Sequence, residues 1–339
     1  MTPDTAPETA GGVLLFDRSS RLRMSFTGAK AAESLTGLVT NDVLALHGGD
    51  GLFACALTAK GRIIADVRIL AIGGASGGAE SFLVDTNAAA GAGFAAMIRK
   101  YVNPRLARYT DVSATTSCVT LVGAAALTTL GRLVTDAELV DALSTGAPFT
   151  HREVKIAGSA VRIVRVPDLG AHAAFDVHSG HDAAGSLVSR LIEEGAQRAT
   201  DEEWHRRRVI AARPEWGIDM DESTLAQEAN MDALQAISYK KGCYTGQETV
   251  ARVHFRGHVN RTLRTVRFAD RVVPTVGTPL LTGDSASVGT ARSCANDDAG
   301  LLIGLAMLRR EVTDGATLSW IDADGSAHAL TVVGAPESD

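Results

Sequence analysis

The densest chemical signal in the sequence is the stretch Lys240-Lys241-Gly242-Cys243-Tyr244-Thr245-Gly246-Gln247-Glu248, in which two glycines flank a cysteine. Gly242 and Gly246 allow backbone conformations that residues with a Cβ rarely adopt, so we expect a tight loop that presents Cys243. The ammonium of Lys241 would favour the thiolate over the thiol, whose ordinary pKa is about 8.5. The loop is therefore a candidate site for a reactive or ligand-binding sulfur. The alternative is a glycine-rich turn around a buried, inert cysteine, which is the common state of a free cysteine.

The residues that follow this loop predict extended structure. Residues 249–253 resemble a strand, because three of the five are β-branched. His254 and His258 lie four apart, which on a helix would pair them as metal ligands, but Gly257 and the neighbouring β-branched residues favour strand and turn. From Thr262 onward short β-prone runs alternate with Gly, Asp and Pro turns. These runs are residues 263–268, 287–291, 301–308, 317–321 and 327–333, and they predict a small all-β barrel or sandwich.

Strands and helices mix without regular alternation in the part of the chain before the loop. A hairpin is expected where residues 52–57 and 62–70 flank Thr58-Ala59-Lys60-Gly61, and the glycine-rich residues 73–78 predict another hairpin connection. The other expected strands are residues 13–16, 22–26, 81–84, 118–122, 153–156, 161–166 and 174–177. The expected helices are residues 29–39, 87–101, 124–133, 183–194 and 200–212. No Gly-x-Gly-x-x-Gly follows a strand, so the pattern indicates an α+β fold and not a Rossmann sheet.

The last of these helices has a clear beginning. Thr200 and Glu203 form a capping box, in which a threonine precedes an acid by three residues. Arg206, Arg207 and Arg208 follow in mid-helix and point in different directions, so we expect two of them to face solvent. The order of expected helices and strands also predicts two parts of the chain. These are an α+β region at residues 13–257 and a C-terminal β-domain at residues 258–335.

Composition narrows the class of protein. The 339 residues are 45% hydrophobic and 21% charged, which is ordinary for a globular protein with a sizeable core. A formal net charge of -6 argues against a general binder of nucleic acid or membrane surfaces. Residues 1–8 contain no Lys or Arg and no apolar core, so they predict a frayed tail and neither a secretory signal nor a transit peptide. We expect a cytoplasmic protein.

Cysteine and histidine usage gives no metal-binding pattern. The four cysteines form no Cys-x-x-Cys, which disfavours a structural zinc site or an iron–sulfur cluster held by four cysteines of this chain. Their separation also fits a reducing compartment. His172, His178 and His181 are scattered along an expected strand and the turn after it, so metal binding is the less favoured interpretation there too. We expect no metal site.

Several motifs together resemble the YgfZ family of folate-binding proteins, which is related to the T-protein (aminomethyltransferase) of the glycine cleavage system. The most specific is the Lys-Gly-Cys-aromatic-x-Gly-Gln-Glu signature that begins at Lys241. The resemblance covers the chain from about Val13 to the C-terminal β-domain. The other motifs are residues 208–219, Gln227-Glu228, Arg256-Gly257-His258-Val259-Asn260-Arg261, Leu38-Val39-Thr40-Asn41-Asp42-Val43 and residues 57–66.

This resemblance implies a fold and a role. The fold is that of the aminomethyltransferases, with two α+β domains and a C-terminal β-barrel around a central opening that accepts tetrahydrofolate or a one-carbon derivative. The implied role is in making or repairing iron–sulfur enzymes. In that family the signature cysteine matters for function, which maps to Cys243, and the neighbouring lysine maps to Lys241.

Folate contacts follow from the resemblance together with the chemistry of the ligand. The pterin edge offers paired donors that suit one carboxylate, and the counterpart of the T-protein glutamate is Asp176, one methylene shorter. The carboxylates of the folate tail call for an arginine, which maps to Arg208. Trp216 could cover the ring or be a structural residue of the core. The resemblance assigns three signature residues to the folate site as well, and these are Tyr244, Gln247 and Glu248.

Two departures from the T-protein pattern separate the possible activities. T-protein has two adjacent acids after its first hairpin, whereas Ala65 precedes Asp66 here, and Ile210 replaces a glutamate. Both favour a folate-binding accessory protein whose partners are iron–sulfur proteins or their assembly machinery. One alternative is a folate-dependent one-carbon transferase or demethylase that uses Asp66 and Asp176. Another is a protein-interaction scaffold that no longer binds folate.

Overall fold

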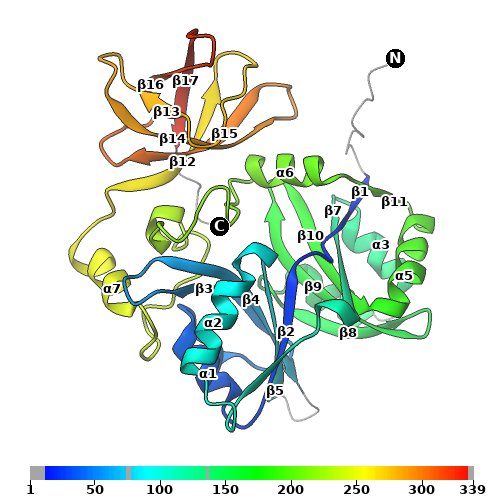
Figure 1. The fold of residues 1–339 in the computed structure, drawn as a ribbon. Helices are drawn as coiled ribbons and strands as arrows, with labels where there is room; N and C mark the ends of the chain where they lie inside the picture. The colour runs from blue at the N-terminus through cyan, green and yellow to red at the C-terminus, as the bar shows by residue number, and fades with distance from the viewer. Residues whose placement is uncertain (1–11, 74–77, 135–136, 335–339) are drawn as a thin grey trace.

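The computed structural model of the chain describes residues 12–73, 78–134 and 137–334. The tail expected at residues 1–8 and the centre of the turn expected at residues 73–78 lie outside the described residues. Three bodies make up the structure, namely a six-stranded sheet, a five-stranded sheet and a closed barrel (Figure 1). The expected α+β fold with a C-terminal barrel is confirmed.

The five-stranded sheet has the strand order β3-β4-β5-β2-β6. Its first hairpin is the one expected from the sequence, because β3 and β4 pair in antiparallel fashion around the turn at residues 58–61. Helices α1 and α2 cover one face, where Phe26, Leu35 and Phe94 are fully buried. Its strands are β2 (Leu22–Thr27), β3 (Gly51–Leu57), β4 (Ile63–Gly73), β5 (Ala79–Thr86) and β6 (Arg108–Asp111), and the helices are α1 (Ala31–Leu38) and α2 (Gly91–Tyr101).

The six-stranded sheet has the order β11-β1-β7-β10-β9-β8. Helices cover its outer face, where Leu121 and Phe175 of the sheet share a buried cluster with Leu191 of a helix. Its strands are β1 (Val13–Asp17), β7 (Thr116–Val122), β8 (His151–Ile156), β9 (Ser159–Leu169), β10 (His172–Gly180) and β11 (Ala196–Arg198), and the helices are α3 (Ala126–Leu133), α4 (Ala137–Thr145) and α5 (His181–Glu193).

The inner faces of the two sheets pack against each other. Phe16 and Val122 of the six-stranded sheet share a buried cluster with Leu70 of the five-stranded sheet. Because side chains alternate along a strand, residues two apart on β4, β7 and β10 point into the same space between the sheets. The result is a four-layer arrangement of helices, sheet, sheet and helices, and it brings residues far apart in sequence together.

The barrel closes through the strand order β12-β15-β14-β13-β16-β17. It lies over helix α6 (Asp201–Ile210), as Figure 1 shows. Ala212 after that helix packs with Leu263, Leu305 and Met307 of the barrel. The barrel strands are β12 (Arg261–Phe268), β13 (Pro279–Leu281), β14 (Ser287–Asn296), β15 (Leu302–Arg309), β16 (Thr317–Ile321) and β17 (Ala327–Gly334).

Helix α6 begins as predicted but buries more charge than predicted. The hydroxyl of Thr200 accepts a hydrogen bond from the backbone N–H of Glu203 at 3.2 Å. The expectation that two of its three arginines face solvent is wrong, because Arg207 and Arg208 are each only 3% exposed. Both guanidiniums have carboxylate partners, which is the condition under which proteins bury arginine.

The prediction of a strand at residues 249–253 is also wrong. These residues belong to helix α7 (Gln247–Arg256), which follows Gly246 directly. Gly246 has φ +87°, so the chain turns sharply before the helix. Tertiary contact overrides the β-propensity here, because Val250 is buried against the core beside Tyr244 while most of the helix stays in solvent. His254 therefore lies within the helix, and His258 lies beyond its end.

In the described part of the chain no helix is both long enough and apolar enough to cross a membrane.

Candidate functional site

The space between the two sheets contains a cavity of about 150 Å³. Asp66 on β4 and Asp176 on β10 line it from opposite sheets, and Trp216 closes one side. A second cavity of about 220 Å³ adjoins it, because Phe53 and Phe149 line both. The rings of these two phenylalanines lie 6.4 Å apart in a stacked arrangement. The two cavities are thus neighbours with shared aromatic walls, and the acidic groups Asp66 and Asp176 lie in the first of them.

Asp176 is already engaged by protein partners. Its Oδ1 accepts a hydrogen bond from the hydroxyl of Thr120 at 2.6 Å, and its Oδ2 lies 2.6 Å from Nη1 of Arg68. Arg68 also pairs with Asp85 at 2.6 Å and so ties three strands together. Burial alone would raise the pKa of Asp85, but Arg21 and Arg68 lower it to about 2. This network holds Asp176 in place at the cavity wall.

Asp66 differs from Asp176 in its surroundings. Its side chain is buried, and among the described residues its Oδ1 has no hydrogen-bond partner. Burial raises the pKa of this carboxyl above its ordinary value, although Arg21 and Arg68 oppose the shift. A buried acceptor without a partner costs stability, so it calls for an explanation such as a bound ligand or a catalytic role. Asp66 therefore offers the cavity a carboxylate oxygen with capacity for a new hydrogen bond.

Arg208 lines the cavity, but protein groups occupy most of its guanidinium. Its two Nη nitrogens make four hydrogen bonds of 2.6–3.2 Å, and its Nε, which makes no hydrogen bond, lies 2.7 Å from a carboxylate oxygen of Glu215. This arrangement leaves only the Nε–H without a hydrogen bond and gives Arg208 a structural role between α6 and the barrel. The partners are Glu215, Asp219, Ser293, the carbonyl of Arg213 and the ring of His205.

Arg18 is a cavity residue that the sequence did not reveal. It lies just beyond β1, and its guanidinium stacks on the ring of Trp204 at 4.0 Å. Arg18 lines the cavity, and among the described residues its side chain makes no hydrogen bond or ion pair. No local motif marks this position, because only the approach of α6 to β1 creates it.

The signature loop lies outside both cavities and presents its cysteine to solvent. Cys243 is exposed, so the alternative of a buried, inert cysteine is wrong. Of the two glycines, only Gly246 takes a positive φ, and a Cβ there would lie 2.6 Å from the carbonyl oxygen of Thr58. A Cβ on Gly242 would meet nothing within 4 Å. The loop is thus fixed against the β3–β4 hairpin through Gly246.

Lys241 anchors the other side of the loop. Its side chain is buried, and its ammonium donates hydrogen bonds to the carbonyl oxygens of Thr36 and Val39 at the end of α1. It also lies over the ring of Tyr244, 4.7 Å from the centroid. Burial lowers the pKa of Lys241 to about 8. With its donors directed at main-chain carbonyls, Lys241 positions the loop that carries Cys243.

The structure divides the predicted site residues into two groups. Asp66, Asp176, Arg208 and Trp216 line the cavity between the sheets. The signature residues lie elsewhere, with Tyr244 in a buried cluster, Gln247 half-buried in the first turn of α7 and Glu248 exposed beside it. None of the three lines either cavity. The signature and the cavity are therefore separate features of one molecule.

Comparison with known proteins shows which family this chain belongs to. The sequence model of the GCVT N-terminal domain matches residues 6–241. The iron–sulfur cluster assembly factor IBA57 homolog of Neurospora crassa is 28% identical over 252 residues, which are 72% of this chain and 51% of that protein. The tRNA-modifying protein YgfZ of Cronobacter sakazakii is 29% identical over 167 residues, 48% of this chain and 50% of that protein. The chain thus matches about half the length of these relatives.

A solved structure supports the same placement. The crystal structure of glycine cleavage system aminomethyltransferase T from Bartonella henselae superposes with a TM-score of 0.80 at 17% identity, covering 97% of this chain and 87% of that chain. At this identity the likeness concerns the fold, and it confirms the fold that the sequence motifs implied. Because the family model matches well over half of the 339 residues, the chain belongs to the family defined by the GCVT N-terminal domain.

Proposed function

We propose that this chain is a tetrahydrofolate-binding accessory protein that acts in the assembly or repair of iron–sulfur enzymes, with Cys243 as its working thiol. The observation that carries the proposal is the position of that thiol. Cys243 is exposed on an anchored loop and does not line the cavities between the sheets. A thiol in this position can reach a partner protein or a cluster while a ligand occupies the cavity.

The residues of the cavity fit a folate. The amino-pyrimidinone edge of a pterin carries paired donors, and the unpartnered Oδ1 of Asp66 is an acceptor for them. Phe53, Phe149 and Trp216 supply apolar walls for a flat ring. Arg18 has donors available for the carboxylates of the tail, whereas both Nη nitrogens of Arg208 are already hydrogen-bonded to protein groups. Bound tetrahydrofolate would supply a carrier of one-carbon units.

Two observations support the iron–sulfur part of the proposal, namely the exposed thiol and the names of the relatives. Thiolates are the usual ligands of iron–sulfur clusters, and an exposed cysteine is available to one. Relatives that share this domain include proteins named as iron–sulfur cluster assembly factors, one from Neurospora crassa and one from Homo sapiens that is 32% identical over 117 residues. A single cysteine cannot hold a cluster alone, so the partner would contribute the remaining ligands.

One observation favours a second activity, that of a folate-dependent one-carbon transferase or demethylase. Asp66 is a buried carboxyl in the cavity, and burial raises its pKa toward the range useful for proton transfer. In that case Asp66 would exchange a proton with the substrate, and Asp176 would be a polar group on the opposite wall of the cavity. Turnover of a methylated or aminomethylated substrate that is lost in Asp66→Asn would establish this activity.

Two measurements test the main proposal. The first is a calorimetric titration of tetrahydrofolate into wild-type protein and Asp66→Asn. Loss of a charged hydrogen-bond acceptor costs about 1.5–3 kcal/mol, so the affinity should fall by roughly 10-fold to 150-fold. Absence of binding to the wild-type protein would remove the folate part of the proposal and favour an interaction scaffold.

The second measurement concerns the thiol. In a strain that lacks this protein, iron–sulfur enzyme activities should fall under oxidative stress and return when the wild-type chain is supplied. Cys243→Ala should bind folate normally but fail to restore these activities. Cys294→Ala is the matched control, because that cysteine lies in the barrel and is only half-buried. Normal iron–sulfur activities in the deletion strain would contradict the proposal.

A further inference from the structure

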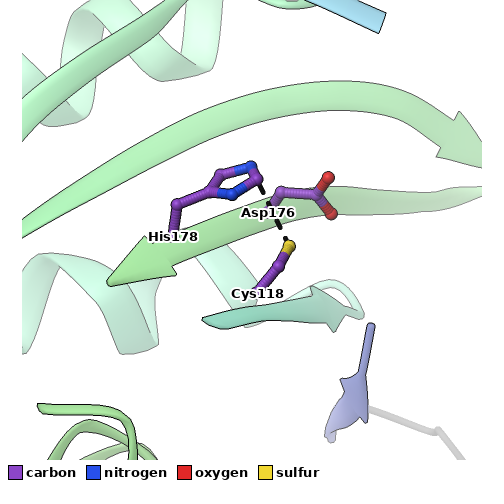
Figure 2. Close-up of side chains that lie close together, drawn as sticks. All are labelled: Cys118, Asp176 and His178. Atoms are coloured by element: carbon purple, nitrogen blue, oxygen red, sulfur yellow. Dashed lines mark hydrogen bonds between the residues drawn. The ribbon is translucent and has the colours of Figure 1, made fainter. Parts of the chain in front are cut away.

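A cysteine, an aspartate and a histidine come together on the inner face of the six-stranded sheet. Cys118 on β7 pairs directly across the strands with His178 on β10, and Asp176 lies two residues before His178 on the same face. Figure 2 shows the three side chains, with a dashed line joining the sulfur of Cys118 and the ring of His178. All three are buried. They bring together a thiol, an imidazole and a carboxylate.

The distances suit a shared metal ion. The Sγ of Cys118 and the Nε2 of His178 lie 3.8 Å apart. A tetrahedral zinc ion with Zn–S of about 2.3 Å and Zn–N of about 2.0–2.1 Å places its sulfur and nitrogen ligands about 3.6 Å apart. One oxygen of Asp176 completes a set in which all ligand atoms lie within 4.8 Å of one another. The three groups could therefore hold an ion with only small movements.

The surroundings of the cluster match those of a metal site. Metal-binding carboxylates are usually oriented by hydrogen bonds of their own, and Thr120 and Arg68 provide these to Asp176. Among the described residues, no protein group pairs with the Nδ1 of His178. In the described part of the chain, the sulfur of Cys118 is thus the side-chain atom that pairs with this buried ring, so protein groups do not use up its bonding capacity.

We propose that Cys118, Asp176 and His178 bind a divalent transition-metal ion of the zinc class. Thiolate and imidazole select zinc or iron over magnesium and calcium, which prefer oxygen ligands. Three protein ligands leave a fourth position, as in catalytic zinc sites. Asp176 also lines the cavity between the sheets, so the ion would lie at the wall of that cavity. The proposal is independent of folate binding and revises the expectation of no metal site drawn from the sequence.

Cobalt tests this site directly, because Co²⁺ accepts the same ligands as zinc and a bound thiolate gives it a near-ultraviolet charge-transfer band. Full-length protein stripped with a chelator should be titrated with CoCl₂ in a Cys243→Ala background, which removes the exposed thiol. We expect the band to saturate at one cobalt per chain and to disappear when Zn²⁺ is added. Addition of zinc alone should also raise the melting temperature, because the ion binds only the folded chain.

Three variants decide the outcome. Cys118→Ala should abolish the band, and His178→Asn should weaken cobalt binding by more than the roughly 10–100-fold that loss of a second-shell partner costs. Cys294→Ala should leave the titration unchanged. Circular dichroism checks that each variant folds. If Cys118→Ala does not fold, His178→Asn still tests the site. Absence of the band in the background protein, or its survival in Cys118→Ala, would overturn the metal site and leave the folate proposal standing.

Discussion

The side chain of Lys241 donates a hydrogen bond to the carbonyl oxygen of Val39 at 2.6 Å, across 202 residues of sequence. Val39 follows the last turn of α1, where main-chain carbonyls lack helical partners. The hydroxyl of Thr40 reinforces the same junction through a bond of 2.6 Å to the carbonyl oxygen of Ala236. The exposed thiol of Cys243 thus owes its position to a buried contact between two distant segments.

Lys241→Met should lower the free energy of unfolding by about 1–3 kcal/mol, because it leaves two carbonyl oxygens at the end of α1 without their donor. Urea unfolding measures the change. Lys240→Met is the matched control, since Lys240 is the exposed neighbour and its loss should change stability by less than about 0.5 kcal/mol. Equal effects of the two substitutions would show that the buried contacts of Lys241 contribute little.

Gly246→Ala should destabilise the protein by about 1–2 kcal/mol or more, because a side chain at φ +87° is strained and its Cβ would approach Thr58 to 2.6 Å. Thermal unfolding and complementation by the variant report the effect on the fold and on the loop. Gly242→Ala should be nearly neutral or slightly stabilising, since a Cβ there meets nothing within 4 Å. A larger cost at Gly242 than at Gly246 would contradict this account of the loop.

Arg68→Met should cost about 3–5 kcal/mol, because it leaves the buried carboxylate of Asp176 without its charged partner between the two sheets, while Asp85 keeps only Arg21. The comparison is Arg190→Met, which breaks an ion pair with Glu193 in which both side chains are more than half exposed. That substitution should cost less than about 1 kcal/mol. Denaturant unfolding of both variants separates the buried pair from the exposed one, and similar values would rule out a special role for Arg68.

Buried histidines should make the protein less stable in mild acid. Burial and the neighbouring charge of Arg162 lower the pKa of His151 to about 4, whereas an unfolded histidine titrates near 6.5. As the pH falls through this window the unfolded chain gains a proton that the folded chain does not. The free energy of unfolding should therefore fall with pH, by up to about 1.4 kcal/mol per unit for each such histidine.

His151→Asn should reduce this slope without removing it, because burial also lowers the pKa of His178 to about 4. Urea unfolding at several pH values between about 7 and about 4 gives the slope for each protein. The comparison near pH 7, where both histidines are neutral in the folded chain and mostly neutral in the unfolded chain, gives mainly the packing cost of the substitution. An unchanged slope would show that His151 does not stay neutral in the folded protein.

Local features of the sequence anticipated much of the fold. The β3–β4 hairpin, the cap at Thr200 and the strands of the barrel rest on turn residues and short-range periodicity, which act within a few residues. The helix at residues 247–256 was missed because its propensities are weak and one buried contact, at Val250, decides its conformation. The burial of Arg207 and Arg208 was missed because their carboxylate partners cannot be identified without the fold.

The sequence by itself determined the family motifs, the signature loop and the identity of the acids at residues 66 and 176. Only the tertiary structure decided what these groups contact. It paired Asp176 with Arg68 across 108 residues, left Oδ1 of Asp66 without a partner, occupied both Nη nitrogens of Arg208 and placed Cys118 beside His178. The physical reason is that a side chain's capacity to bind a ligand depends on its burial and on which partners are already within hydrogen-bonding distance. Both are set when distant strands pack against each other.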